Sequence, residues 1–231
     1  MTYAHIILRR RAMRRALVLA AAALVLAACG STDGTPGMGD AGAPSPSRAD
    51  QVARGKATIA ESVRRSDREA GAAVILRAPP WAFLDMLPWL EDRAPSFPPE
   101  YLYAMAQRLY PQQRTRAGFW WMAGRTRMLY DGLRCTDRTV GAAAIQSWDS
   151  RLAPLVRDLT GDAATAVDTA IEALEWDIEQ APHRVSLVAF CRNGAAGADD
   201  RSRWVKTGID EARLREEARM PLRLLIRKSG G

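Results

Sequence analysis

Histidine and cysteine are scarce in this sequence, which holds two of the first and three of the second among 231 residues. No C-x-x-C pair is present, and the signatures of serine hydrolases, zinc peptidases, nucleotide-binding loops and haem attachment are also missing. Beyond the first few residues the single histidine is His183, directly after Pro182 at a predicted helix end, where a surface or helix-terminus histidine is the ordinary outcome. The sequence therefore indicates no metal, no cofactor and no histidine-dependent catalysis.

Acidic residues are absent before Cys29, where five arginines stand instead. Without those arginines, 28 basic residues face 26 acidic ones, so the formal charge of +7 falls to +2. A nucleic-acid partner, which net basicity would favour, loses its support. Long hydrophobic runs are lacking too, because the unbroken run 16–28 has 13 residues and a membrane-spanning helix needs about 20.

An arginine-rich start, a short apolar run and small residues before a cysteine are typical of a bacterial export signal. Met13 would serve as the start as well as Met1, because two arginines follow it. The tetrapeptide Leu26-Ala27-Ala28-Cys29 resembles the lipobox of bacterial lipoproteins. That resemblance implies cleavage before Cys29, acylation of Cys29 and membrane attachment through lipid. The alternative is an ordinary signal peptide that happens to contain a cysteine.

Gly30 and Ser31 differ from the aspartate that holds many enterobacterial lipoproteins at the inner membrane. The resemblance therefore implies an outer-membrane anchor that faces the periplasm. The segment 29–49 has almost no large apolar side chain, which predicts a flexible tether. A Gly/Ser-like coil of about 20 residues reaches roughly 25 Å. The folded domain is expected at 50–231.

Two cysteines, Cys135 and Cys191, remain after the anchor. Disulfides form and persist in exported proteins, so we expect these two to pair. A bridge that closes a loop of this length would stabilise the fold by about 4 kcal/mol. Metal ligation is the alternative, and a mature chain with one histidine gives it little support.

Apolar residues of the folded part recur with helical spacing and not with the alternation of strands, which predicts an all-α domain. Pro98 and Pro99 indicate a helix start, and Pro111 indicates its end. A second helix is expected at about 113–131, with the small residue Gly124 at the contact between the two. The pair predicts an antiparallel hairpin.

This hairpin resembles one tetratricopeptide unit. Its matching residues are Leu102, Met105, Ala106 and Leu109 in the first helix and Ala117, Trp121 and Gly124 in the second. The stretches PPEYLYAMAQRLY, AGFWWMAGRTR and IEALEWD also resemble a group of uncharacterised exported proteobacterial proteins. These resemblances imply an irregular helical fold built around the hairpin and bring no known activity with them.

Further helices are predicted at 145–159, where Pro154 should kink or divide the chain, at 162–180 and at 209–220. The run 185–190 is either strand-like or a buried turn of helix. In 162–180 the periodicity predicts a buried face of Val167, Ile171, Leu174 and Ile178. Its opposite, acidic face is expected to be a solvated surface, the alternative being a cation site, and consists of Asp168, Glu172, Glu175 and Glu179.

Tryptophan is abundant, with seven residues, and four of them form a candidate groove for a partner: Trp81, Trp89, Trp120 and Trp121. The last two are adjacent on a helix, so both are buried only if that helix is covered on two sides. The segment 79–90 is either a lid packed on the hairpin or a partner-binding surface. The stretch 219–228 is expected to pack as a last helix, the alternative being contact with anionic lipid head groups.

The sequence thus favours a membrane-tethered periplasmic lipoprotein that binds another envelope protein as a non-enzymatic assembly factor, a plan shared by pilotin-type lipoproteins. Glu61-Ser62 resembles the Glu-Ser pair of lytic transglycosylases, which cleave cell-wall glycan, and such an enzyme is the alternative. Nearby arginines would lower the pKa of Glu61, whereas a general acid needs a raised pKa. A structural lipoprotein without a specific partner is a third possibility.

Overall fold

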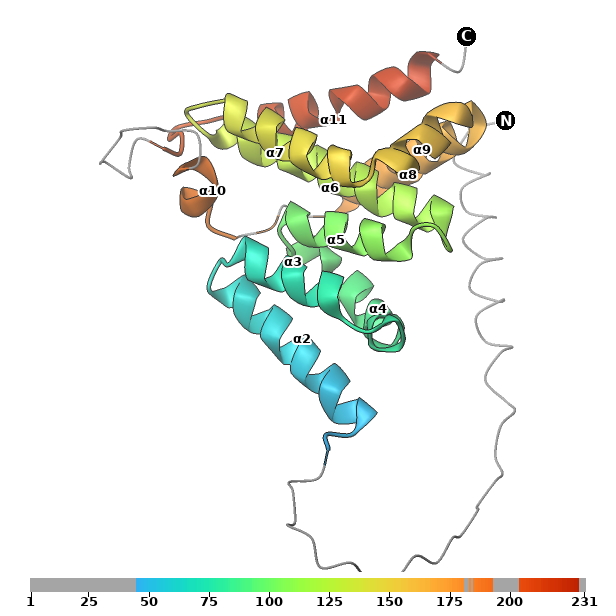
Figure 1. The fold of residues 1–231 in the computed structure, drawn as a ribbon. Helices are drawn as coiled ribbons and strands as arrows, with labels where there is room; N and C mark the ends of the chain where they lie inside the picture. Colours follow the sequence, from blue (N-terminus) through green and yellow to red (C-terminus); the bar gives the residue numbers. More distant parts are fainter. Residues whose placement is uncertain (1–44, 181–182, 184, 193–203, 229–231) are drawn as a thin grey trace, which may run out of the picture. The chain divides into compact units, whose positions relative to one another are not determined.

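The computed structural model describes residues 45–180, 183, 185–192 and 204–228, which belong to one unit that begins at Ser45 (Figure 1). In chain order the helices are α2 (Arg48–Arg64), α3 (Arg68–Arg77), α4 (Pro80–Arg93), the 3-10 helix η1 (Ala94–Ser96), α5 (Pro99–Leu109), α6 (Arg114–Arg134), α7 (Thr139–Arg151), α8 (Ala153–Gly161), α9 (Ala163–Glu179), α10 (Val188–Arg192) and α11 (Glu211–Lys228). The described residues contain no β-strand, which confirms the all-α prediction. The predicted signal peptide, Cys29 and the tether up to residue 44 lie outside them.

The helix ends follow local signals in the sequence. Ser47 caps α2, where its hydroxyl accepts a hydrogen bond from the Asp50 amide and the Asp50 carboxylate accepts one from the Ser47 amide. The domain therefore starts slightly earlier than the expected residue 50. Pro154 separates α7 from α8, as predicted. None of the described helices is both long and apolar enough to cross a membrane.

α5 and α6 form the centre of the domain, and the other helices pack around them (Figure 1). α5 packs closely on α6: a Cβ added at Gly124, in the middle of α6, would lie 3.1 Å from the ring of Tyr103 and 3.4 Å from the carbonyl of Pro99. α3 packs on α5, α2 packs on α3, and α7, α9 and α11 pack on α6. The core therefore lies along α5 and along α6 from Ala117 onward.

The buried face of α9 differs from the prediction. It consists of Ala166, Thr169, Ala170, Ala173 and Asp177, whereas Ile178 is 49% exposed and Val167, Ile171 and Leu174 are only half-buried. α9 crosses α6 at Gly118, where an added Cβ would lie 3.3 Å from the methyl group of Thr169. Small side chains let the two helices approach closely, so the hydrophobic periodicity indicated the wrong face.

Asp177 is buried on α9 because two arginines meet it there. Arg219 of α11 donates to its carboxylate at 2.7 Å, and Arg127 of α6 does so at 3.4 Å. Arg127 also donates to the carbonyl of Pro95 at 2.8 Å and lies over the ring of Trp176, 4.2 Å from its centre. This cluster fastens α11 and α9 to α6.

α11 is longer than the predicted helix 209–220. It runs through Pro221 to Lys228 and buries Leu214, Ala218, Arg219 and Leu222, so the stretch 219–228 packs as the continuation of this helix. The run 185–190 contains no strand. Its second half, from Val188, belongs to the short helix α10, and its first half is the segment before that helix.

Candidate functional site

The four candidate tryptophans do not share one environment. Trp81 and Trp89 lie half-buried on α4, with the guanidinium of Arg48 5.1 Å from the Trp81 ring centre. Trp120 is 4% exposed and packs in the core against the ring of Trp176, 5.6 Å away between centroids. Trp121 is half-buried, and its indole N–H donates to Asp149 of α7 at 2.7 Å. Trp120 is therefore a core residue, and of the adjacent pair only Trp121 keeps part of its surface.

Glu61 lies exposed on α2 and accepts hydrogen bonds from Arg64 and Arg65. Those hydrogen bonds lower the pKa of the Glu61 carboxyl. The neighbouring Ser62 is buried, and its hydroxyl donates to the carbonyl of Thr58 at 2.9 Å. A surface carboxylate that two arginines keep ionised is a poor general acid.

A network of buried charges joins α3, α5, α6 and the segment before α10. Arg68 donates through Nε to both carboxylate oxygens of Glu100, at 2.8 and 2.9 Å, and through Nη2 to Asp131 at 2.6 Å. Nε2 of His183 lies 3.1 Å from each oxygen of Asp131. The amide of Val185 donates to Nδ1 of His183 at 3.3 Å. His183 is buried, so the surface position expected from the sequence is wrong.

In this network, burial raises the pKa of each carboxyl, and pairing with a cationic side chain lowers it. Burial would raise the pKa of Asp131, but the attraction and hydrogen bonds of His183 and Arg68 lower it to about 2. Burial raises the pKa of Glu100, and its pairing with Arg68 opposes that rise only in part. Asp131 is thus a fixed negative charge, while Glu100 is a carboxyl at the edge of the network.

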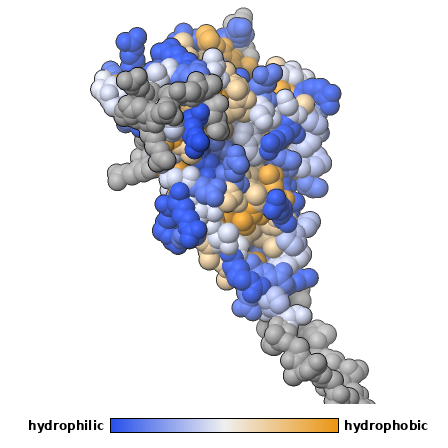
Figure 2. All heavy atoms as spheres, turned by 60° about the vertical axis from the view of Figure 1, so that its left-hand side comes forward, coloured by the Kyte–Doolittle hydropathy of each residue, from blue (hydrophilic) through white to orange (hydrophobic). Residues whose placement is uncertain are grey.

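A groove lies between α3 and α7, with Glu100 of α5 at its floor and a volume of about 500 Å³. Its α3 wall consists of Glu69, Ala72, Ala73 and Leu76, and its α7 wall of Thr139, Val140, Ala143, Ala144, Ser147, Trp148 and Arg151. Figure 2 shows one face of the domain, on which hydrophobic residues gather among hydrophilic ones. Two further hollows, of about 530 and 470 Å³, border α4, but neither has a buried ion pair at its floor.

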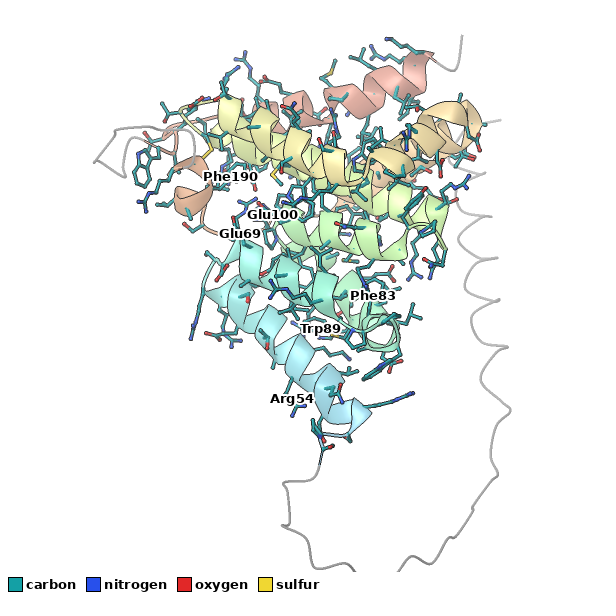
Figure 3. The ribbon with its side chains drawn as sticks, in the orientation of Figure 1. Arg54, Glu69, Phe83, Trp89, Glu100 and Phe190 are labelled. Carbon is teal, nitrogen blue, oxygen red and sulfur yellow. A yellow bond between two sulfur atoms is a disulfide. The ribbon has the colours of Figure 1, made fainter. Side chains whose placement is uncertain are left out.

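Phe190 of α10 closes one end of the groove, where Figure 3 shows it with Glu69 and Glu100. Its ring centre lies 4.4 Å from the guanidinium carbon of Arg68, so it also covers the charge network. The next residue, Cys191, is bonded to Cys135 after α6, with 5.3 Å between the two Cα atoms. This disulfide, which confirms the predicted pairing, holds α10 at the groove.

Neither residue of the Arg68–Glu100 ion pair carries a signal of burial in the sequence. Glu100 follows two prolines and carries the ordinary signal of a helix start. Arg68 stands in the arginine-rich stretch 62–71, which indicates a solvated helix. Single charged residues in these settings are exposed in most proteins, and no local pattern marks the pair as buried.

No protein family, curated protein or solved structure matches this chain. In the described part of the chain no group of three or more histidine, cysteine, aspartate and glutamate side chains is placed to hold a metal ion. This includes the acidic face of α9, where Asp168 and Glu179 are exposed. The α3–α7 groove is therefore the candidate functional site on geometry alone.

Proposed function

We propose that this protein is a lipid-anchored protein of the bacterial cell envelope that binds another protein through the α3–α7 groove and does no chemistry there. The observation that carries the proposal is the groove itself, with apolar walls from two helices and an aromatic side chain at one end. Exposed apolar side chains that gather within a polar rim mark sites where proteins bind one another. An assembly or recruitment factor needs a surface of this kind and no catalytic group.

The carboxyl at the groove floor supports binding over catalysis. Both oxygens of Glu100 accept hydrogen bonds from Nε of Arg68. This buried pairing with a guanidinium is the arrangement of a structural ion pair, in which the carboxylate balances the charge of Arg68. Glu61, the other candidate acid, has a lowered pKa and lies on a different helix. The cell-wall enzyme is thus the weaker reading.

The envelope location is proposed from the resemblance of residues 26–29 to a lipobox. In cells grown with radiolabelled palmitate, the wild-type protein should take up label and move with the membrane fraction. Cys29→Ser should lose both properties, while Cys135→Ser should keep the label. Equal labelling of the wild type and Cys29→Ser would refute the lipid anchor.

Photo-crosslinking in intact cells tests the groove. A photoreactive amino acid at Ala143, an exposed groove residue, should give one discrete adduct, and Ala164, an exposed residue on α9, serves as the matched control. The adduct at position 143 should disappear when Leu76→Arg fills the opposite wall. An adduct with glycan fragments would favour the cell-wall enzyme, and equal adducts from both positions would remove the groove as the binding site.

A further inference from the structure

Building on the proposed function, we infer that the groove receives an amphipathic α-helix of about three turns from the partner protein, with a basic residue at the Glu69 end and an acidic residue at the Arg151 end. The inference rests on three features of the groove: the spacing of its wall residues, the size of their side chains and the placement of its charges.

The wall residues form one stripe on each helix. On α3, Glu69, Ala72, Ala73 and Leu76 follow the spacing of i, i+3, i+4 and i+7. On α7 the lining residues keep the same three–four spacing from Thr139 to Arg151. α3 packs on α2 and α5, and α7 packs on α6 and α8, so both stripes face the groove. Two facing stripes at helical spacing are the two sides that a third helix packs between.

The dimensions of the α7 stripe set the length of the occupant. From Thr139 to Arg151 the stripe covers the whole of α7, about 18 Å at 1.5 Å per residue. An α-helix of the same length has about three turns. Four of the eleven wall residues are alanine, two on each helix, and α7 adds a serine and a threonine. Short side chains at a contact allow interaxial distances of about 8 Å.

The charges at the two ends of the groove differ in sign. Glu69 is exposed at the end closed by Phe190, and within the described ranges no ion pair holds its carboxylate. Glu100, on the floor at the same end, is already paired with Arg68, so Glu69 is the carboxylate that faces a partner there. At the far end of α7 the guanidinium of Arg151 lies over Trp148, 4.7 Å from its centre, and pairs with no carboxylate of a described residue. A partner helix with opposite charges at its two ends complements this arrangement and has a fixed direction.

Peptide selection tests the inference without knowledge of the partner. The probe is a library of random 16-residue peptides displayed on phage, selected against the purified mature chain carrying Cys29→Ser. Retained peptides should place apolar residues at three–four spacing, with lysine or arginine near one end and aspartate or glutamate near the other. A synthetic copy of a retained peptide should gain helical circular dichroism when the protein is added.

Matched variants locate the bound peptide. Ala143→Arg should weaken binding more than tenfold, whereas Ala164→Arg on α9 should change it less than twofold. Glu69→Lys should weaken peptides with a basic end several-fold, and Asp85→Lys, which reverses an exposed charge on α4, should not. All four positions are exposed, so these proteins should fold.

Three results would each overturn the inference: no retained peptide, retained peptides that bind without gaining helicity, or binding that Ala143→Arg and Glu69→Lys leave unchanged. The proposed function is judged separately, because the in-cell adduct at position 143 does not depend on the shape of the partner. A non-helical peptide together with that adduct would keep the binding function and remove only the helix.

Discussion

Asp131 is a single carboxylate with no exposed surface that neutralises Arg68 and holds His183. Asp131→Asn would leave the guanidinium of Arg68 buried with one carboxylate in place of two. Loss of one partner from a buried ion pair typically costs about 3–5 kcal/mol. Urea unfolding at neutral pH should show a loss of that order. Asp85→Asn, an exposed change, should stay within about 0.5 kcal/mol of the wild type.

The same residue predicts how stability depends on pH. Because the pKa of Asp131 is about 2 in the folded protein and 3.8 by ordinary value, its contribution is complete from about pH 5 upward and is lost as pH falls through 3.8 toward 2. Glu100 acts in the opposite sense, since its raised pKa makes ionisation in the folded state costly as pH rises. The difference in unfolding free energy between wild type and Asp131→Asn should therefore shrink between about pH 5 and pH 2. A difference that stays constant over this range would contradict the assignment.

At the scale of the helix, the sequence predicts where elements end better than which side they bury. Prolines and caps act locally, so Pro99 and Pro154 mark boundaries that the structure confirms. A buried face depends on the neighbour, and on α9 the neighbour is the small residue Gly118 of α6. The groove could not be predicted from the sequence for the same reason. Its walls come from two separate helices, α3 and α7, and their alanines give no strong periodic signal.

The contact between α6 and α7 depends on a pair of glycines. A Cβ added at Gly132 would lie 2.5 Å from Cα of Gly141, a backbone atom that cannot turn away. Alanine usually stabilises a helix over glycine by about 0.5–1 kcal/mol, but here overpacking should outweigh that gain. Thermal or urea unfolding of Gly132→Ala should show a net loss of about 1–3 kcal/mol.

Gly161 provides the control for this helix contact. It lies exposed at the end of α8, and a Cβ added there would meet no atom within 4 Å. Gly161→Ala should therefore be neutral or slightly stabilising. Similar losses in the two variants would show that helix propensity, and not the close approach of α6 and α7, determines the effect.

At the scale of the whole domain, the Cys135–Cys191 bond connects the central helices to the groove end. It closes a loop of 56 residues, for which the chain-entropy estimate is about 4 kcal/mol. The double variant Cys135→Ser, Cys191→Ser should lose about that much stability in urea and should bind selected peptides more weakly, because α10 and Phe190 are no longer fastened. Added reductant should weaken the wild type to the same level and leave the double variant unchanged.

The Cys135–Cys191 disulfide also bears on when the groove is able to bind a partner. Under the proposed export, the chain is made in a reducing compartment, where such bonds do not persist, and acquires this one afterwards. Since the cystine fastens the aromatic end of the groove, a precursor still in the cytoplasm would have this docking surface unfinished. Under the proposed function, the groove would then bind its partner only after the Cys135–Cys191 disulfide has formed outside the cytoplasm.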